Sequence, residues 1–120
     1  MSVGDYNAFQ FSDGLVDVLG VARGSSAPVN EVVAPGPDLV EPDYINLVST
    51  LSRAPRYSYV FGGNAQFLDH ILVNTQMSGR LTRFGYVRNN ADFPEVLRND
   101  PNRPERISNH DMPVATFRLP

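Results

Sequence analysis

Proline and glycine interrupt this sequence so often that long helices are excluded. The 120 residues include ten prolines and nine glycines. A proline inside a helix removes a backbone donor and clashes with the preceding turn, and glycine weakens both helices and strands. Residues 24–43 alone hold Pro28, Pro35, Pro37 and Pro42. We therefore expect short elements joined by many connections, and we exclude a helical bundle.

The clearest local pattern is a β-hairpin in the middle of the chain. Residues 57–61 are rich in aromatic and β-branched side chains, and residues 65–73 are β-rich again. Between them lies the segment Gly62-Gly63-Asn64, and paired glycines supply the positive φ angles of a tight turn. The sequence therefore predicts two antiparallel strands joined at these glycines.

Weaker patterns predict the other elements. A turn followed by a short helix is expected within residues 9–22, capped by Ser12 or Asp13. Further helical segments are expected over residues 44–51 and, as a single turn, over residues 75–80. Strands are predicted over three more ranges, which are residues 31–33, 83–88 and 113–119. The polar residues 89–109 are broken by proline and should form a loop.

This order of elements predicts one α/β (α+β) piece that spans residues 1–120. Its sheet should be mostly antiparallel, with the short helices layered on one face. The other face should then be uncovered and should need a partner. We expect that face to carry four apolar side chains, Tyr59, Phe67, Ile71 and Phe117.

Composition and charge exclude several classes of protein. Hydrophobic residues make up 42% and charged residues 19% of the chain, which is typical of a folded protein. The net charge of −3 excludes a generally basic nucleic-acid coat, although a local cationic groove stays open. The lack of cysteine excludes disulfides and thiolate catalysis. No apolar run is long enough to span a membrane, so no membrane partner is expected, and no signal peptide is visible at Met1.

Four polar groups are candidates for chemistry. They are Asp5 with Asn7, Asp69 with His70, the segment Ser108-Asn109-His110-Asp111, and the arginines Arg80, Arg83, Arg103 and Arg106. Each group also has a purely structural interpretation. Asp5 and Asn7 can cap a turn, His70 can be a packed core residue, His110 can be an ordinary loop histidine, and the arginines can form a solvated surface.

Taken in chain order, the acidic and imidazole groups resemble a known superfamily. Residues 4–7 read Gly-Asp-Tyr-Asn, Asp69 follows Leu68 in an apolar run, and residues 108–111 precede the last predicted strand. This series is similar to the C-terminal half of the endonuclease/exonuclease/phosphatase superfamily, which is deoxyribonuclease I-like, and to its bacterial nuclease-like branch. The resemblance covers essentially the whole chain. It implies half of a four-layer α/β sandwich.

The resemblance also implies a metal-dependent phosphodiesterase or endonuclease, which is a hydrolase of phosphoesters. Asp5 would orient or deprotonate the attacking water, and Asn7 would hold that water or the phosphate. His110 would bind the scissile phosphate or act as acid and base. Asp69 would accept a hydrogen bond from His110 and so fix the tautomer of the imidazole. A magnesium or manganese ion would neutralise charge on the phosphate.

Two departures from the family pattern modify that expectation. The family has Asp at the metal-site position where this chain has Asn109, so a weaker metal site is expected. The family's N-terminal half, with its metal-binding Glu and second catalytic His, has no counterpart here, and only His70 remains for that second role. We expect an isolated chain to be incomplete or inactive, and to need a complementary N-terminal half.

Two alternatives to this enzyme remain open. In the first, the chain is a non-catalytic half-domain that forms a homodimer through its uncovered sheet face. In the second, it is a fragment without independent function. The substrate is not predicted beyond nucleic acid or another phosphodiester, because members of the superfamily act on DNA, RNA, lipids and sugar phosphates. The sequence predicts no location in the cell.

Overall fold

The central strand is β5, Asp69–Val73, and all five of its residues are buried. Three of the five, Ile71, Leu72 and Val73, are apolar, which suits a strand covered on both faces. In the computed structural model, which describes residues 1–119, β5 pairs antiparallel with β1 (Ser2–Asp5) on one side and β2 (Ile45–Asn46) on the other. The register places Asp5 opposite Asp69. Residues that face each other across an antiparallel pair project to the same side of the sheet, so both carboxylates lie on one face.

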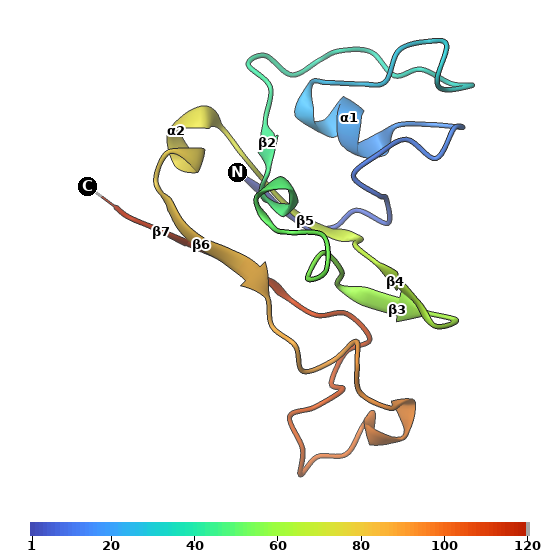
Figure 1. Ribbon diagram of the computed structural model, residues 1–120, viewed down its shortest axis with the longest axis vertical. Coiled ribbons are helices and arrows are strands. Elements are labelled where there is room, and N and C mark those ends of the chain that lie inside the picture. The colour runs from blue at the N-terminus through green and yellow to red at the C-terminus, as the bar shows by residue number, and fades with distance from the viewer. Residues whose placement is uncertain (120) are drawn as a thin grey trace.

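A hairpin and a second two-stranded sheet complete the sheet structure, and the fold is α+β with antiparallel strands in small sheets (Figure 1). β3 (Tyr59–Phe61) pairs with β4 (Asn64–Gln66), and β6 (Leu81–Tyr86) pairs with β7 (Pro113–Phe117). Gly62 and Gly63 join β3 to β4 with φ angles of 55° and 79°, which confirms the predicted hairpin turn. The predicted strand over residues 65–73 is wrong in one respect. It divides into β4 and β5, which belong to different sheets.

The main core lies between β5, β6 and the 3₁₀ helix Leu47–Thr50. Its buried side chains are Leu47, Val48, Ile71, Val73 and Phe84, and each contributes about 1.5–3 kcal/mol through removal of its surface from water. Ile71 retains only 4% exposure, and both Phe67 and Phe117 pack against this cluster. The expectation of an uncovered face is therefore wrong for Ile71, whereas Tyr59, Phe67 and Phe117 are half-buried.

The helices are shorter than the sequence predicts. α1 is Val18–Arg23, and its N-cap is Asp17, which accepts a hydrogen bond from the backbone N–H of Gly20 at 2.9 Å. Asp13 was expected to cap this helix, but its carboxylate accepts the N–H groups of Leu15 and Val16 in the preceding turn. α2 is the single turn Thr75–Ser78, as predicted.

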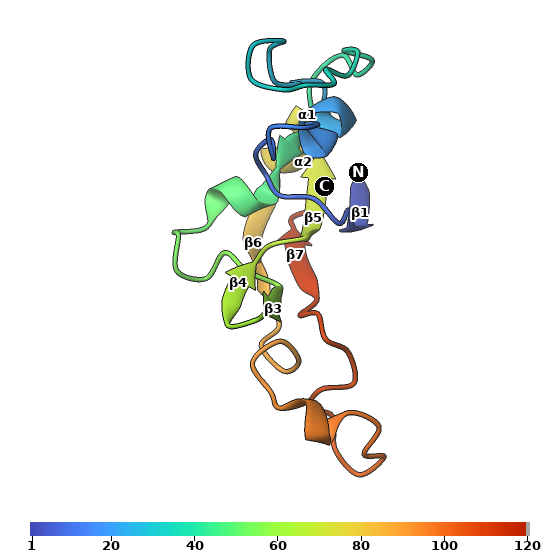
Figure 2. The same cartoon turned by 90° about the vertical axis from the view of Figure 1, so that its right-hand side faces the viewer.

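Three further segments differ from the predictions. The predicted helix over residues 44–51 is instead β2 followed by the 3₁₀ helix, and residues 31–33 form no strand. β1 was not predicted, because a four-residue run with one large apolar side chain gives no periodic pattern. Residues 89–109 form the predicted loop, which contains the 3₁₀ helix Glu95–Leu97 and projects away from the sheets (Figures 1 and 2).

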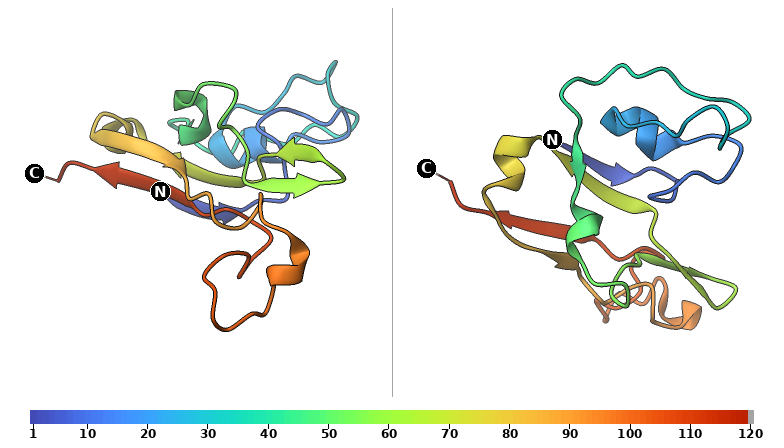
Figure 3. Two further views of the ribbon diagram at one scale, coloured as in Figure 1. Left: turned by 60° about the horizontal axis from the view of Figure 1, so that its bottom comes forward. Right: turned by 45° about the horizontal axis from the view of Figure 1, so that its top comes forward.

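The molecule is flat, with principal extents of 47 × 42 × 23 Å. The two-stranded sheet of β6 and β7 lies alongside β5 and β1 in both views of Figure 3. The loop before β7 returns the chain toward β3, where His110 makes a bridge with Tyr59. This return positions the candidate site.

Candidate active site

Asp5, Asp69 and His110 meet on one face of β5. They come from the end of β1, the start of β5 and the loop before β7. One side-chain oxygen or nitrogen of each residue lies within 4.8 Å of the others. The β1–β5 register explains the carboxylate pair, and the bridge to Tyr59 explains the approach of His110. Three positions that are far apart in sequence thus form one polar cluster.

Asp69 and His110 make the direct contact that the sequence led us to expect. Nδ1 of His110 lies 2.7 Å from Oδ2 of Asp69. Since a carboxylate only accepts hydrogen bonds, Nδ1 carries the proton. Nε2 has no hydrogen-bond partner within residues 1–119. Asp69 therefore fixes the imidazole tautomer and leaves the lone pair on Nε2 available for chemistry.

Both backbone polar groups of Asp69 are hydrogen-bonded to side chains. Its N–H donates to Oγ of Ser58 at 3.2 Å, and its carbonyl accepts a 2.7 Å hydrogen bond from the hydroxyl of Tyr86. Ser58 is fully buried, and burial strongly raises the pKa of Tyr86, so this phenol stays a neutral donor. Asp69 is thus a rigid partner for His110.

Tyr59 packs its ring against the imidazole of His110. The two ring centroids are 4.6 Å apart, and the planes are inclined by only 20°. Aromatic contacts of this kind contribute roughly 0.5–1.5 kcal/mol beyond the area they bury. Asp69 and Tyr59 together restrain the imidazole, one through a hydrogen bond at its edge and the other through its face.

The next residue, Asp111, anchors the loop that carries His110. Its carboxylate is completely buried. Oδ2 binds the guanidinium of Arg88 at 2.9 Å, and Oδ1 accepts the backbone N–H groups of Asn90 and Ala91 at 2.9 and 3.1 Å. The guanidinium of Arg88 also lies 3.6 Å above the ring centre of Tyr57. This role of Asp111 was not predicted from the sequence, although its position beside a candidate histidine could have indicated it.

Polar contacts continue on the other side of His110. Asn90 donates its side-chain amide to the carbonyl of His110 at 2.8 Å, and the N–H of His110 donates to Oγ of Ser108 at 3.1 Å. Arg106 donates to the carbonyl of Asn90 at 2.8 Å. The loop on both sides of His110 is therefore fixed by side chains from within residues 88–111.

A groove of about 420 Å³ opens over the cluster. Asp69 and His110 contribute to its wall, together with exposed apolar side chains on β1 and around the start of β7. Val3 is 53%, Ile107 72% and Met112 63% exposed. The polar cluster is thus surrounded by apolar surface that nothing in residues 1–119 covers.

The other two predicted site residues, Asn7 and Asn109, make no side-chain hydrogen bond to the cluster among the described residues. Asn7 is exposed with a φ of 48°, and its backbone N–H donates to Oδ1 of Asp5 at 2.8 Å. This is the turn-capping contact of the structural interpretation. Asn109 is half-buried beside His110, and no hydrogen bond of its side chain is found among the described residues. The structure therefore brings together Asp5, Asp69 and His110, but gives no contact that adds either amide to them.

His70 points to the opposite face of β5 and cannot act as a second histidine of this cluster. Its Nδ1 lies 2.9 Å from the side-chain amide nitrogen of Asn46, and its Nε2 lies 2.9 Å from the carbonyl of Ala8. Burial lowers the pKa of His70, so the imidazole is neutral. Side chains alternate along a strand, which places neighbouring Asp69 and His70 on different faces. The packed-core interpretation of His70 is the one the structure supports.

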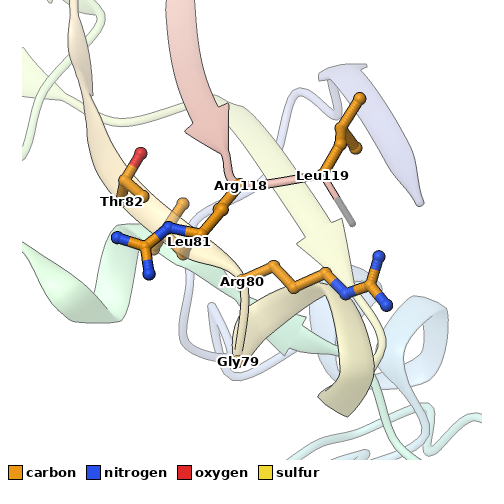
Figure 4. Close-up of a pocket in the computed structure, with 6 residues that line it drawn as sticks. All are labelled: Gly79, Arg80, Leu81, Thr82, Arg118 and Leu119. Carbon is orange, nitrogen blue, oxygen red and sulfur yellow. The ribbon is translucent and has the colours of Figure 1, made fainter.

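The predicted arginine group does not form one site. Arg103 pairs with Glu105, and Arg106 pairs with Glu95. Arg80 lines a separate pocket of about 330 Å³ together with Arg118, but their side chains extend in opposite directions (Figure 4). Two diverging guanidinium groups do not make a common anion site.

The cluster offers ligands of the kind that divalent cations take. Two carboxylates and an imidazole can bind Mg²⁺ or Mn²⁺. The closest oxygen of Asp69 is already bound to His110, and a cation there would replace that hydrogen bond. Asp5 is exposed, and of its oxygens only Oδ1 is bound by the N–H of Asn7. The carboxylate of Asp5 is therefore the main oxygen ligand that the cluster offers a cation.

Comparison with known proteins gives no relative of this chain. No protein-family model, no curated protein and no solved structure matches it. Among residues 1–119, no helix is long and apolar enough to cross a membrane.

Proposed function

We propose that this chain is the C-terminal half of a metal-dependent phosphodiesterase of the endonuclease/exonuclease/phosphatase type. The observation that carries the proposal is the 2.7 Å contact between Asp69 and His110, which are 41 positions apart, beside Asp5. A histidine with one nitrogen fixed by a carboxylate and the other free is arranged for proton transfer. The motif order in the sequence supports the same class of enzyme.

In this mechanism His110 acts through Nε2, which faces no protein acceptor or donor within the described residues. Asp69 keeps the proton on Nδ1, so the neutral imidazole presents a lone pair and the cation presents an N–H to a phosphate oxygen. Asp5 orients and deprotonates the attacking water, and Asn7 holds the water or the phosphate. A bound Mg²⁺ or Mn²⁺ would supply positive charge for the phosphate, with Asp5 as its ligand and Asn109 as a weaker, neutral one.

The proposal is tested by hydrolysis of bis(p-nitrophenyl) phosphate with Mn²⁺, using two histidine variants and the purified chain, each alone and together with a complementary N-terminal half, because the chain alone is expected to be inactive. His110→Ala should abolish any hydrolysis, whereas His70→Gln changes a residue on the opposite face and should retain it. A rate unchanged in His110→Ala would show that the assigned site is wrong.

Metal binding gives a second test that does not require turnover. Asp5→Asn should weaken Mn²⁺ binding measured by calorimetry. Asn109→Asp should strengthen it, because a full negative charge replaces a neutral oxygen. If neither change alters Mn²⁺ affinity, the metal part of the proposal fails.

A second candidate function is a non-catalytic module that associates through the surface around the groove. The exposed apolar side chains of Val3, Ile107 and Met112 favour it, since such surface is typical of protein contacts. A complementary half or a second copy would cover the same residues. Sedimentation equilibrium tests self-association, and Met112→Asp should dissociate a dimer formed there. A chain that stays monomeric at high concentration would eliminate the homodimer.

A further inference from the structure

Three rings follow one another from the candidate site to the tip of the β3–β4 hairpin. The imidazole of His110 stacks on Tyr59 at a centroid distance of 4.6 Å. Tyr59 in turn stacks on Phe61 at 6.3 Å, with an interplanar angle of 23°. Residues two apart on a strand project to the same side, so the two β3 rings lie on one face. The aromatic surface is therefore continuous with the predicted catalytic histidine.

The outer end of this ring series is open to solvent. Phe61 is 64% exposed, and its partner across the hairpin is the polar residue Asn64. The turn at Gly62 and Gly63 holds β3 and β4 together. Phe61 thus presents a large exposed ring on a fixed hairpin, at the outer end of a ring series that begins at His110.

A second exposed aromatic residue shows what is special about Phe61. Phe11 is similarly exposed, at 61%, but stacks on Phe9 and lies edge-on to Phe67. Phe67 in turn lies edge-on to His70. That aromatic group therefore leads to the buried histidine, whereas Phe61 leads to His110.

We propose that Tyr59 and Phe61 form a stacking surface for an unpaired nucleobase next to the phosphodiester held at His110. The substrate class is then single-stranded nucleic acid, and not a lipid or sugar phosphate. This inference rests on the proposed function. Bases stack on aromatic side chains irrespective of sequence. A stacked strand advances about 3.4 Å per nucleotide, so the ring-to-ring distances from His110 through Tyr59 to Phe61 correspond to at most about three nucleotides.

The charge of the chain defines how such binding should depend on salt. With a net charge of −3, the protein as a whole does not attract phosphates. Stacking should then account for much of the affinity, and the affinity should fall only shallowly as salt increases. Measurements belong at low salt, where weak binding can be quantified.

The test is fluorescence anisotropy with a labelled oligothymidine and an abasic oligonucleotide of equal length, in EDTA so that no cleavage occurs. Phe61→Ala should weaken oligothymidine binding at least about five-fold, since each stacked base contributes roughly 1–3 kcal/mol. Binding of the abasic strand should not change. Phe61→Trp should retain the affinity for oligothymidine, and Phe11→Ala is the matched control at a similarly exposed ring.

The proposed stacking surface would be wrong if Phe61→Ala weakened binding of oligothymidine and of the abasic strand equally, or weakened binding of neither. A shift of the sedimentation equilibrium by Phe61→Ala without any change in oligothymidine binding would also overturn it, because the ring would then belong to a protein contact. Failure of the proposed function is distinguishable from these results. It appears as hydrolysis of bis(p-nitrophenyl) phosphate that His110→Ala leaves unchanged, and that substrate contains no nucleobase.

Discussion

The two faces of β5 hold the chain's two histidines in opposite ways. On one face His70 is fully buried, and both of its nitrogens are hydrogen-bonded, to Asn46 and Ala8. On the other face Nδ1 of His110 is bound to Asp69, whereas its Nε2 meets no protein partner within residues 1–119. His70 is the sequence neighbour of Asp69, but His110 is the histidine that binds it. A histidine's role therefore depends on how many of its ring nitrogens remain free of protein partners, and not on its distance in sequence from an aspartate.

The two faces also differ in what surrounds each imidazole. His70 lies edge-on to Tyr6 and Phe67 in a closed setting. His110 has Tyr59 on one ring face and an open groove beside it. One environment stabilises the fold by keeping its histidine neutral, and the other restrains a histidine while leaving it accessible.

The largest effect is expected from Asp111→Ala, which removes the anchor of the His110 loop. This change leaves Arg88 without its buried partner and two N–H groups without an acceptor. Loss of one member of a fully buried pair typically costs about 3–5 kcal/mol, and because the side chain of Arg88 is 28% exposed, we expect a loss at the lower end of this range. Urea denaturation measures the free energy of unfolding. Arg98→Ala is the control, because its ion pair with Glu95 is exposed and should contribute about 1 kcal/mol or less.

A somewhat smaller loss is expected from His70→Ala. The change leaves the amide of Asn46 and the carbonyl of Ala8 without partners, and each unsatisfied buried group costs about 1–3 kcal/mol. Thermal denaturation should show a lower Tm for this variant than for His70→Gln, which can still donate to Ala8. Equal stability of the two variants would contradict the structural role assigned to His70.

The pH dependence of stability tests whether His70 is held neutral in the folded state. Burial lowers the pKa of His70 below its ordinary value of 6.5 in the folded state. The unfolded chain therefore binds the proton more readily. The contribution of His70 is fully present above pH 6.5 and is lost as the pH falls from there through the folded pKa. Urea denaturation between pH 8 and 5 should show this decline, and His70→Gln should make it shallower.

The smallest effect is expected at Tyr59, whose ring restrains His110 from one side. Tyr59→Ala should cost about 1 kcal/mol through loss of the aromatic contact. It should also let the imidazole reorient, which NMR detects as averaged ring signals of His110. Tyr59→Phe retains the stacked ring and should leave both properties unchanged. An unaltered His110 signal in Tyr59→Ala would contradict the restraint.

Some of this structure could be predicted from the sequence because its determinants are local. Gly62 and Gly63 specify the hairpin turn through their positive φ angles. The alternating pattern of residues 113–117 specifies β7. The contact between Asp69 and His110 was predictable only through the order of motifs along the chain. Spacing alone contains no information on a hydrogen bond across 41 positions.

Other features depend on tertiary contacts and could not be predicted locally. β1 exists because the buried strand β5 supplies hydrogen-bond partners for Ser2–Asp5. The covered position of Ile71 depends on the 3₁₀ helix and β6 folding over it. The stacking of Tyr59 on His110 and the anchoring of Asp111 by Arg88 join segments more than 20 positions apart.

The tautomers of the two histidines test the central claim most directly. At pH 8, long-range ¹H–¹⁵N NMR of the imidazole rings distinguishes the protonated nitrogen of each neutral histidine. The contacts predict a proton on Nδ1 of His110 and a proton on Nε2 of His70. Asp69→Asn should change the tautomer of His110 and leave the tautomer of His70 unchanged. Observation of the Nε2–H tautomer at His110, unaffected by Asp69→Asn, would contradict the proposed site.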